Sequence, residues 1–213
     1  MTVHSKAVRA AVALVAATAL ALTGCSAGGG ESAQSLDGSQ LLTIPREDMG
    51  TFERNFNPFS NPDFPMTQEA IFESMLVYNP ADGSTTPWLA TDWEVAPDSM
   101  GITYHLREGV TWSDGEPFVA DDVVLTFDLQ REVRGGFDYI DSVTAVDPLT
   151  VQFTFNQAFS PALLDLGQQV IAPAHVWSKV DDPTKYANEK PVGTGPYTEV
   201  TNFQSQSDRK SVV

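Results

Sequence analysis

The sequence predicts an α+β fold built on a mixed or antiparallel sheet. Short segments that alternate like strands are interspersed with helical segments, without the regular strand–helix–strand order of a parallel sheet. The clearest strand covers 102–106, where apolar Ile102, Tyr104 and Leu106 alternate with polar residues. No period of about 20 to 50 residues repeats, so solenoid and propeller architectures are excluded.

The N-terminus has the organisation of a secretory signal peptide. A short cationic start precedes an apolar run from Ala10 to Leu22, which is too short to cross roughly 30 Å of hydrocarbon. Small residues follow this run and lead to Cys25, the chain's single cysteine. We therefore expect 1–24 to be a lipoprotein signal peptide and Cys25 to be the lipidated first residue of the mature chain. An ordinary signal peptide followed by an unrelated cysteine is the alternative.

Residues 25–39 are predicted to be a flexible tether, because Gly, Ser and Ala dominate this stretch and large apolar side chains are scarce. The whole chain is acidic, with 28 Asp and Glu against 12 Lys and Arg and a formal net charge of −16. Such a surface disfavours nucleic acid and anionic lipid headgroups.

Residues 40–207 are predicted to form the folded domain, which begins with a strand over 40–45. A helix is expected to begin near Thr67, which suits an N-cap, because apolar residues follow it at helical spacing. These apolar residues are Ile71, Phe72, Met75 and Leu76. After turn signals at Asn79-Pro80 and Asp82-Gly83, strands are expected around 93–95 and 102–106.

A turn and a helix follow the second of these strands. Ser113-Asp114-Gly115 predicts the turn, since Gly tolerates positive φ and Asp can close an Asx-turn. Asp121 and Asp122 are expected in the first turn of a helix over 120–131, as exposed acids that match the positive end of its dipole. Gly135-Gly136 is expected to end this helix.

The remaining elements are a hairpin and two short helices. The hairpin strands are predicted over 142–146 and 151–155, joined by a turn at Asp147-Pro148, because Val151, Phe153 and Phe155 alternate with polar residues. Short helices are expected over 159–166 and 174–180.

Catalytic, metal and cofactor sites find little support in the sequence. His105 and His175 are interpreted as structural or surface residues, and neither a G-x-S-x-G elbow nor a metal-binding spacing of His or Cys is present. Acidic residues are plentiful, which leaves a secreted lipoprotein hydrolase as the alternative of a different class. A purely structural envelope lipoprotein is the third reading. Trp88, Trp93, Trp112 and Trp177 could stack on a sugar, but packing is the favoured role of the first three.

The string HLREGVTWSDGEPFVADDV, over 105–123, resembles the signature of the family 5 extracellular solute-binding proteins, which serve ABC importers. Four more segments occur in the order of that family, and they are Asn57-Pro58-Phe59, 71–78, 87–90 and 192–197. Val119, where a capping Thr is usual, and Met100-Gly101, where Asp-Gly is usual, depart from the pattern.

This resemblance implies the first, incomplete lobe of a two-lobed, hinged receptor of the periplasmic-binding-protein type, with the second lobe missing. It implies a non-enzymatic, cofactor-free monomer that binds an oligopeptide or a short oligosaccharide and delivers it to ABC permease subunits. The location implied is extracytoplasmic, with a lipid anchor in the outer face of the cytoplasmic membrane. Ligand contacts of this lobe are implied for the loop after Asn57-Pro58, at Ser60, Asn61, Asp63 and Phe64.

The C-terminal residues 208–213, Asp-Arg-Lys-Ser-Val-Val, are expected to be a non-native tail. This string followed by a stop is what the start of a common short-read sequencing adapter encodes. We therefore expect the native sequence to continue differently after about Ser207.

Overall fold

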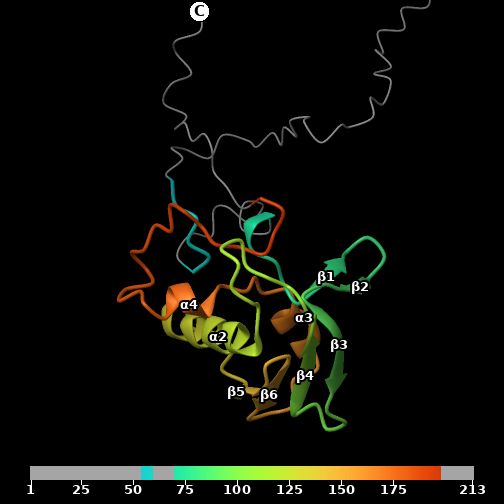
Figure 1. The fold of residues 1–213 in the computed structure, drawn as a ribbon. Helices are drawn as coiled ribbons and strands as arrows, with labels where there is room; N and C mark the ends of the chain where they lie inside the picture. Colours follow the sequence, from blue (N-terminus) through green and yellow to red (C-terminus); the bar gives the residue numbers. More distant parts are fainter. Residues whose placement is uncertain (1–53, 60–69, 198–213) are drawn as a thin grey trace, which may run out of the picture. The chain divides into compact units, whose positions relative to one another are not determined.

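A four-stranded antiparallel sheet with one long helix packed on it forms the centre of the structure (Figure 1). The computed structural model describes residues 54–59 and 70–197. The predicted signal peptide, the tether, the strand over 40–45 and the tail at 208–213 lie outside the described residues. No helix in the described ranges is long and apolar enough to cross a membrane.

The described strands are β1 (Leu76–Asn79), β2 (Ser84–Pro87), β3 (Ala90–Val95), β4 (Gly101–Leu106), β5 (Ile140–Asp147) and β6 (Thr150–Phe155). The described helices with assigned bounds are α2 (Ala120–Arg134), α3 (Ala162–Gly167) and α4 (Ala174–Trp177). β1 and β2 form a separate hairpin, and the central sheet has the order β3-β4-β6-β5. Every pairing between these strands is antiparallel. The α+β prediction is confirmed, as are the hairpin and the strands around 93–95 and 102–106.

The core lies between α2 and the central sheet. Side chains along β4 and β6 alternate between the core face and the other face of the sheet, as predicted. Tyr104, Val151 and Phe153 lie on the core face and are fully buried. Phe127 of α2 meets Phe153 edge-on, with ring centroids 4.9 Å apart. α2 ends at Arg134, three residues beyond the predicted end, and Gly135 and Gly136 follow with positive φ of 68° and 85°.

The helix expected from Thr67 is wrong beyond Ile71, because that segment bends and then becomes β1. The carbonyl of Ala70 accepts a hydrogen bond from the N–H of Tyr197, and that of Ile71 accepts one from Gly195. In a continuing helix these carbonyls would instead accept from the residues four positions later. The apolar residues at helical spacing are buried because other segments enclose this stretch, and they do not form one helical face.

The turn at Ser113-Asp114-Gly115 is confirmed, with φ of +93° at Gly115. Asp121 and Asp122 were both expected to be surface acids. This expectation is wrong for Asp122, which is only 2 % exposed. Asp121 is exposed as expected. The misplacement has a simple cause, because adjacent helical residues point roughly 100° apart and α2 turns Asp122 toward the protein.

The Asp122 carboxylate collects three hydrogen bonds from three segments. Oδ2 accepts from Trp112 Nε1 at 3.1 Å and from the backbone N–H of Val119 at 2.9 Å. Oδ1 accepts from the backbone N–H of Ala174 at 2.7 Å. Burial raises the pKa of Asp122, and these three donors oppose that rise by favouring the charged form. The bond from Val119 is the half of a capping box in which the N3 side chain accepts from the N-cap N–H, while the Val119 side chain itself caps nothing.

Asp122→Asn should lower the free energy of unfolding by about 2 to 3 kcal/mol, because an amide presents N–H groups where the protein already presents donors. The matched control is Asp121→Asn, the exposed neighbour, which should cost less than about 1 kcal/mol. Urea unfolding of both variants measures the difference. Equal losses in the two variants would show that the Asp122 network contributes nothing beyond the helix dipole.

Candidate functional site

The loop predicted to contact ligand, with Ser60, Asn61, Asp63 and Phe64, lies outside the described residues, and so does Cys25. The structure does describe the chain on both sides of this loop, at 54–59 and from Ala70 onward. These two flanking segments determine where the loop leaves and rejoins the scaffold. We call the attachments of these two flanking segments to the scaffold the anchors of the loop.

Asn57 is the first anchor and is completely buried. Its Nδ2 donates to the carbonyls of Pro183 and Tyr186, at 2.6 and 2.7 Å. Its Oδ1 accepts from the backbone N–H of Phe59 at 2.7 Å, which closes a local turn. One side chain thus ties the start of the loop to a segment more than a hundred residues later.

Arg134, at the end of α2, holds the same turn from the other side. Nε donates to the carbonyl of Phe59 and Nη2 to the carbonyl of Pro58, both at 2.8 Å. Burial lowers the pKa of the Arg134 guanidinium, which nevertheless stays charged at neutral pH. The Phe59 ring also packs edge-on against Trp177, with centroids 4.7 Å apart. The sequence analysis missed Arg134, and no local signal marks it, because its partners are backbone carbonyls distant in sequence.

The second anchor is a close crossing of backbones where the loop rejoins the scaffold. A Cβ on Gly193 would lie 2.0 Å from the carbonyl oxygen of Ile71, and one on Gly195 would lie 2.3 Å from that of Ala70. Only glycine permits this approach, which explains the Val-Gly-Thr-Gly-Pro-Tyr segment at 192–197. The anchors at Asn57 and at Ala70 therefore fix both ends of the predicted ligand loop.

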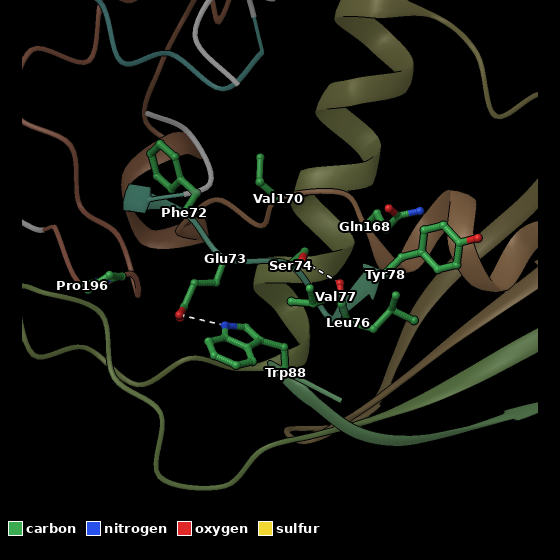
Figure 2. A pocket seen from close by; sticks show the side chains of 10 residues that line it. All are labelled: Phe72, Glu73, Ser74, Leu76, Val77, Tyr78, Trp88, Gln168, Val170 and Pro196. Carbon is green, nitrogen blue, oxygen red and sulfur yellow. Dashed lines mark hydrogen bonds between the residues drawn. The ribbon is translucent and has the colours of Figure 1, made fainter. Parts of the chain in front are cut away.

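A groove of about 370 Å³ begins directly after the second anchor (Figure 2). We call it the Trp88 groove, and its lining includes Phe72, Glu73, Val77, Tyr78, Trp88 and Gln168. Trp88 is 45 % exposed and its Nε1 donates to Glu73 Oε1 at 2.8 Å.

The packing role expected for Trp88 is therefore wrong, because its ring faces the groove. That role is confirmed for Trp112, which is buried, and for Trp93, which packs against the core.

His175 and Asp114 pair beside the Asp122 network, with His175 Nε2 2.7 Å from Asp114 Oδ2. Partial burial would raise the pKa of Asp114, but His175 and the N–H of Glu116 hold it below its usual value. The hydrogen-bond partner of His175 in the described ranges is thus a carboxylate in a turn. His105 lies 3.8 Å from Asp92 on the exposed side of the sheet. Within the part of the chain that the structure describes, no group of three potential metal ligands gathers.

Comparison with known proteins places this arrangement in one family. A model of the bacterial extracellular solute-binding proteins, family 5 Middle, matches residues 84–209. The dipeptide-binding protein of Escherichia coli is 29 % identical over 183 residues, which are 71 % of this chain and 34 % of that protein.

The chain also resembles solved structures, including one from Campylobacter jejuni and one from Thermotoga maritima. NikZ from Campylobacter jejuni, solved in complex with Ni(L-His), has 28 % identity and a TM-score of 0.61 over 68 % of this chain and 30 % of its own. The periplasmic oligopeptide-binding protein of Thermotoga maritima, solved with bound mannohexaose, has 30 % identity and a TM-score of 0.58 over 68 % of this chain and 28 % of its own. The chain therefore spans about a third of the length of the proteins it resembles.

Arg134→Met should lower the free energy of unfolding by about 2 kcal/mol, because it removes two short bonds to buried carbonyls while keeping the apolar stem. Arg131→Met is the matched control on the same helix, since Arg131 makes one long bond of 3.4 Å to the carbonyl of Ile140. That control should cost less than about 1 kcal/mol. Chemical unfolding measures both, and a larger loss in the control would contradict the anchoring role of Arg134.

Proposed function

Because the chain belongs to the family 5 bacterial extracellular solute-binding proteins, we propose that it is part of a receptor that captures oligopeptides or short oligosaccharides for an ABC importer. The observation that carries the proposal is the family match over 84–209, and the anchors at Asn57 and Ala70, on either side of the predicted ligand loop, support it. Binding loops supported by a rigid scaffold are where receptors place ligand contacts. The loop residues proposed to touch ligand remain Ser60, Asn61, Asp63 and Phe64.

Peptide is the ligand class we favour over sugar. A dipeptide-binding protein is among the relatives, while a second relative was solved with mannohexaose, which keeps oligosaccharides as an alternative. The described lobe would close on the ligand together with a second lobe, by hinge motion around the bound molecule. In this proposal the receptor is a monomer, makes and breaks no bond, and passes its ligand to permease subunits.

The hydrolase alternative has less support from the described residues. Glycoside hydrolysis needs two carboxyl groups facing one substrate. Among the described residues, Glu73 is the one carboxylate that lines the Trp88 groove, and Asp122 is buried in its own hydrogen-bond network. A binding role fits this groove better than a hydrolytic one.

Ligand binding tests the proposal directly. Tripeptides titrated into the receptor should bind, and ligand at a hundred times its Kd should raise stability by about 2.7 kcal/mol. Asp63→Ala should weaken binding at least about tenfold, a loss of about 1.4 kcal/mol. Asp141→Ala, at an exposed position of β5, is the matched control and should leave affinity unchanged. A receptor that binds neither peptides nor oligosaccharides in calorimetry would refute the proposed function.

The proposed membrane tether rests on Cys25 and the apolar run before it. Cys25→Ser should leave an unprocessed precursor or release the protein from the membrane, because the substituted residue has no thiol to acylate. Fractionation with a radiolabelled fatty acid measures both outcomes. A variant that still sediments with membranes as a mature-sized, labelled protein would show that another residue carries the anchor.

A further inference from the structure

The Trp88 groove combines an exposed aromatic face with a carboxylate. Trp88 keeps 45 % of its surface exposed, and an amphipathic aromatic ring at a surface can serve as a platform for a ligand. Figure 2 shows its indole joined to Glu73 by a hydrogen bond, with Tyr78 and Gln168 on the other side of the groove. That bond uses only one of the two carboxylate oxygens, Oε1.

Glu73 is the charged residue of the groove lining, and its charge has no ion-pair partner among the described residues. The three ion pairs recorded there join other residues, at Asp92, Asp114 and Asp182. Arg107 has a different partner, because its Nε donates to the carbonyl of Trp88 at 2.8 Å. Arg107 therefore supports the Trp88 backbone and makes no ion pair with Glu73.

Backbone hydrogen bonds fix the main chain at both Glu73 and Trp88. The carbonyl of Glu73 accepts from the N–H of Ile171 at 2.9 Å, and the N–H of Trp88 donates to the carbonyl of Met75 at 3.0 Å. Because these bonds and the indole bond fix the pair before any ligand arrives, little freedom is lost on binding. Glu73 and Trp88 are therefore preorganised for binding.

We propose that the Trp88 groove binds an ammonium group of the ligand between the Glu73 carboxylate and the face of the Trp88 indole. The inference rests on the proposed receptor function, since it assigns a chemistry to part of that ligand. A carboxylate and an indole face both attract cations, the first by a charge-assisted hydrogen bond and the second through the ring quadrupole.

The charge of the protein favours a cation over a neutral group. With a formal net charge of −16, the surrounding field raises the local concentration of positive ligands. A sugar hydroxyl could donate to Glu73 as well, but it would leave the carboxylate charge uncompensated in the groove. The geometry thus selects peptides that present an ammonium group at this point over neutral oligosaccharides.

The test compares n-butylammonium with its neutral analogue n-butanol in the receptor. The indole N–H resonance of Trp88, identified by its loss in Trp88→Phe, should shift and saturate with n-butylammonium at roughly millimolar Kd. It should not respond in this way to n-butanol. Glu73→Gln keeps a carbonyl oxygen for the indole bond and should weaken n-butylammonium binding at least about tenfold. Glu94→Gln, on β3, is the matched control for loss of one acidic charge and should have no such effect.

Equal responses to the two probes would overturn the inference, and both titrations are made on the unsubstituted receptor. Equal weakening by Glu94→Gln would overturn it too, because the effect would then be general electrostatics. A receptor that binds Ala-Lys-Ala equally well with and without Glu73→Gln would keep the proposed function and lose this subsite. Conversely, a receptor that responds to n-butylammonium as expected but binds neither peptides nor oligosaccharides would keep the subsite and lose the proposed function.

Discussion

The buried carboxylate of Asp122 is the interaction on which the described structure most depends. It connects the indole of Trp112, the first turn of α2 and the first residue of α4, and so joins three segments that are separate in sequence. Without an acceptor at this point, two part-buried backbone N–H groups and one buried indole N–H would lose their partner, at about 1 to 3 kcal/mol for each group that stays buried. The turn at 113–115 follows Trp112 directly, and its Asp114 pairs with His175, the residue after Ala174.

This network also explains how the candidate site is supported. α4 carries Trp177, whose ring holds Phe59, and α2 ends at Arg134, which binds the carbonyls next to it. The two elements that Asp122 joins therefore both reach the start of the predicted ligand loop. The family signature over 105–123 is consequently a structural motif whose effect on the site is indirect.

Local sequence patterns predicted much of this fold. They failed where hydrogen bonds between residues distant in sequence determine the structure. β4, α2 and the β5–β6 hairpin follow from periodicity and turn residues that are close together in sequence. The helix expected to run through Phe72 and Met75 was wrong, because the carbonyls before it bond to Gly195 and Tyr197. Asp122 looked like its exposed neighbour, since its donors come from residues 112 and 174. The exposure of Trp88 also depends on segments remote in the chain, whereas Arg134 has backbone partners that no side-chain pattern reveals.

The long sequence separation of the two anchors has a consequence for the order of folding. Asn57 bonds to carbonyls 126 and 129 residues later, whereas the strands of the β5–β6 hairpin are neighbours. Closing such long loops costs more entropy and is slower than forming local contacts. The sheet and α2 can therefore assemble early, while the two ends of the predicted ligand loop are fixed late. A folding molecule should pass through a stage in which its sheet is formed but the hydrogen bonds of Asn57 are not.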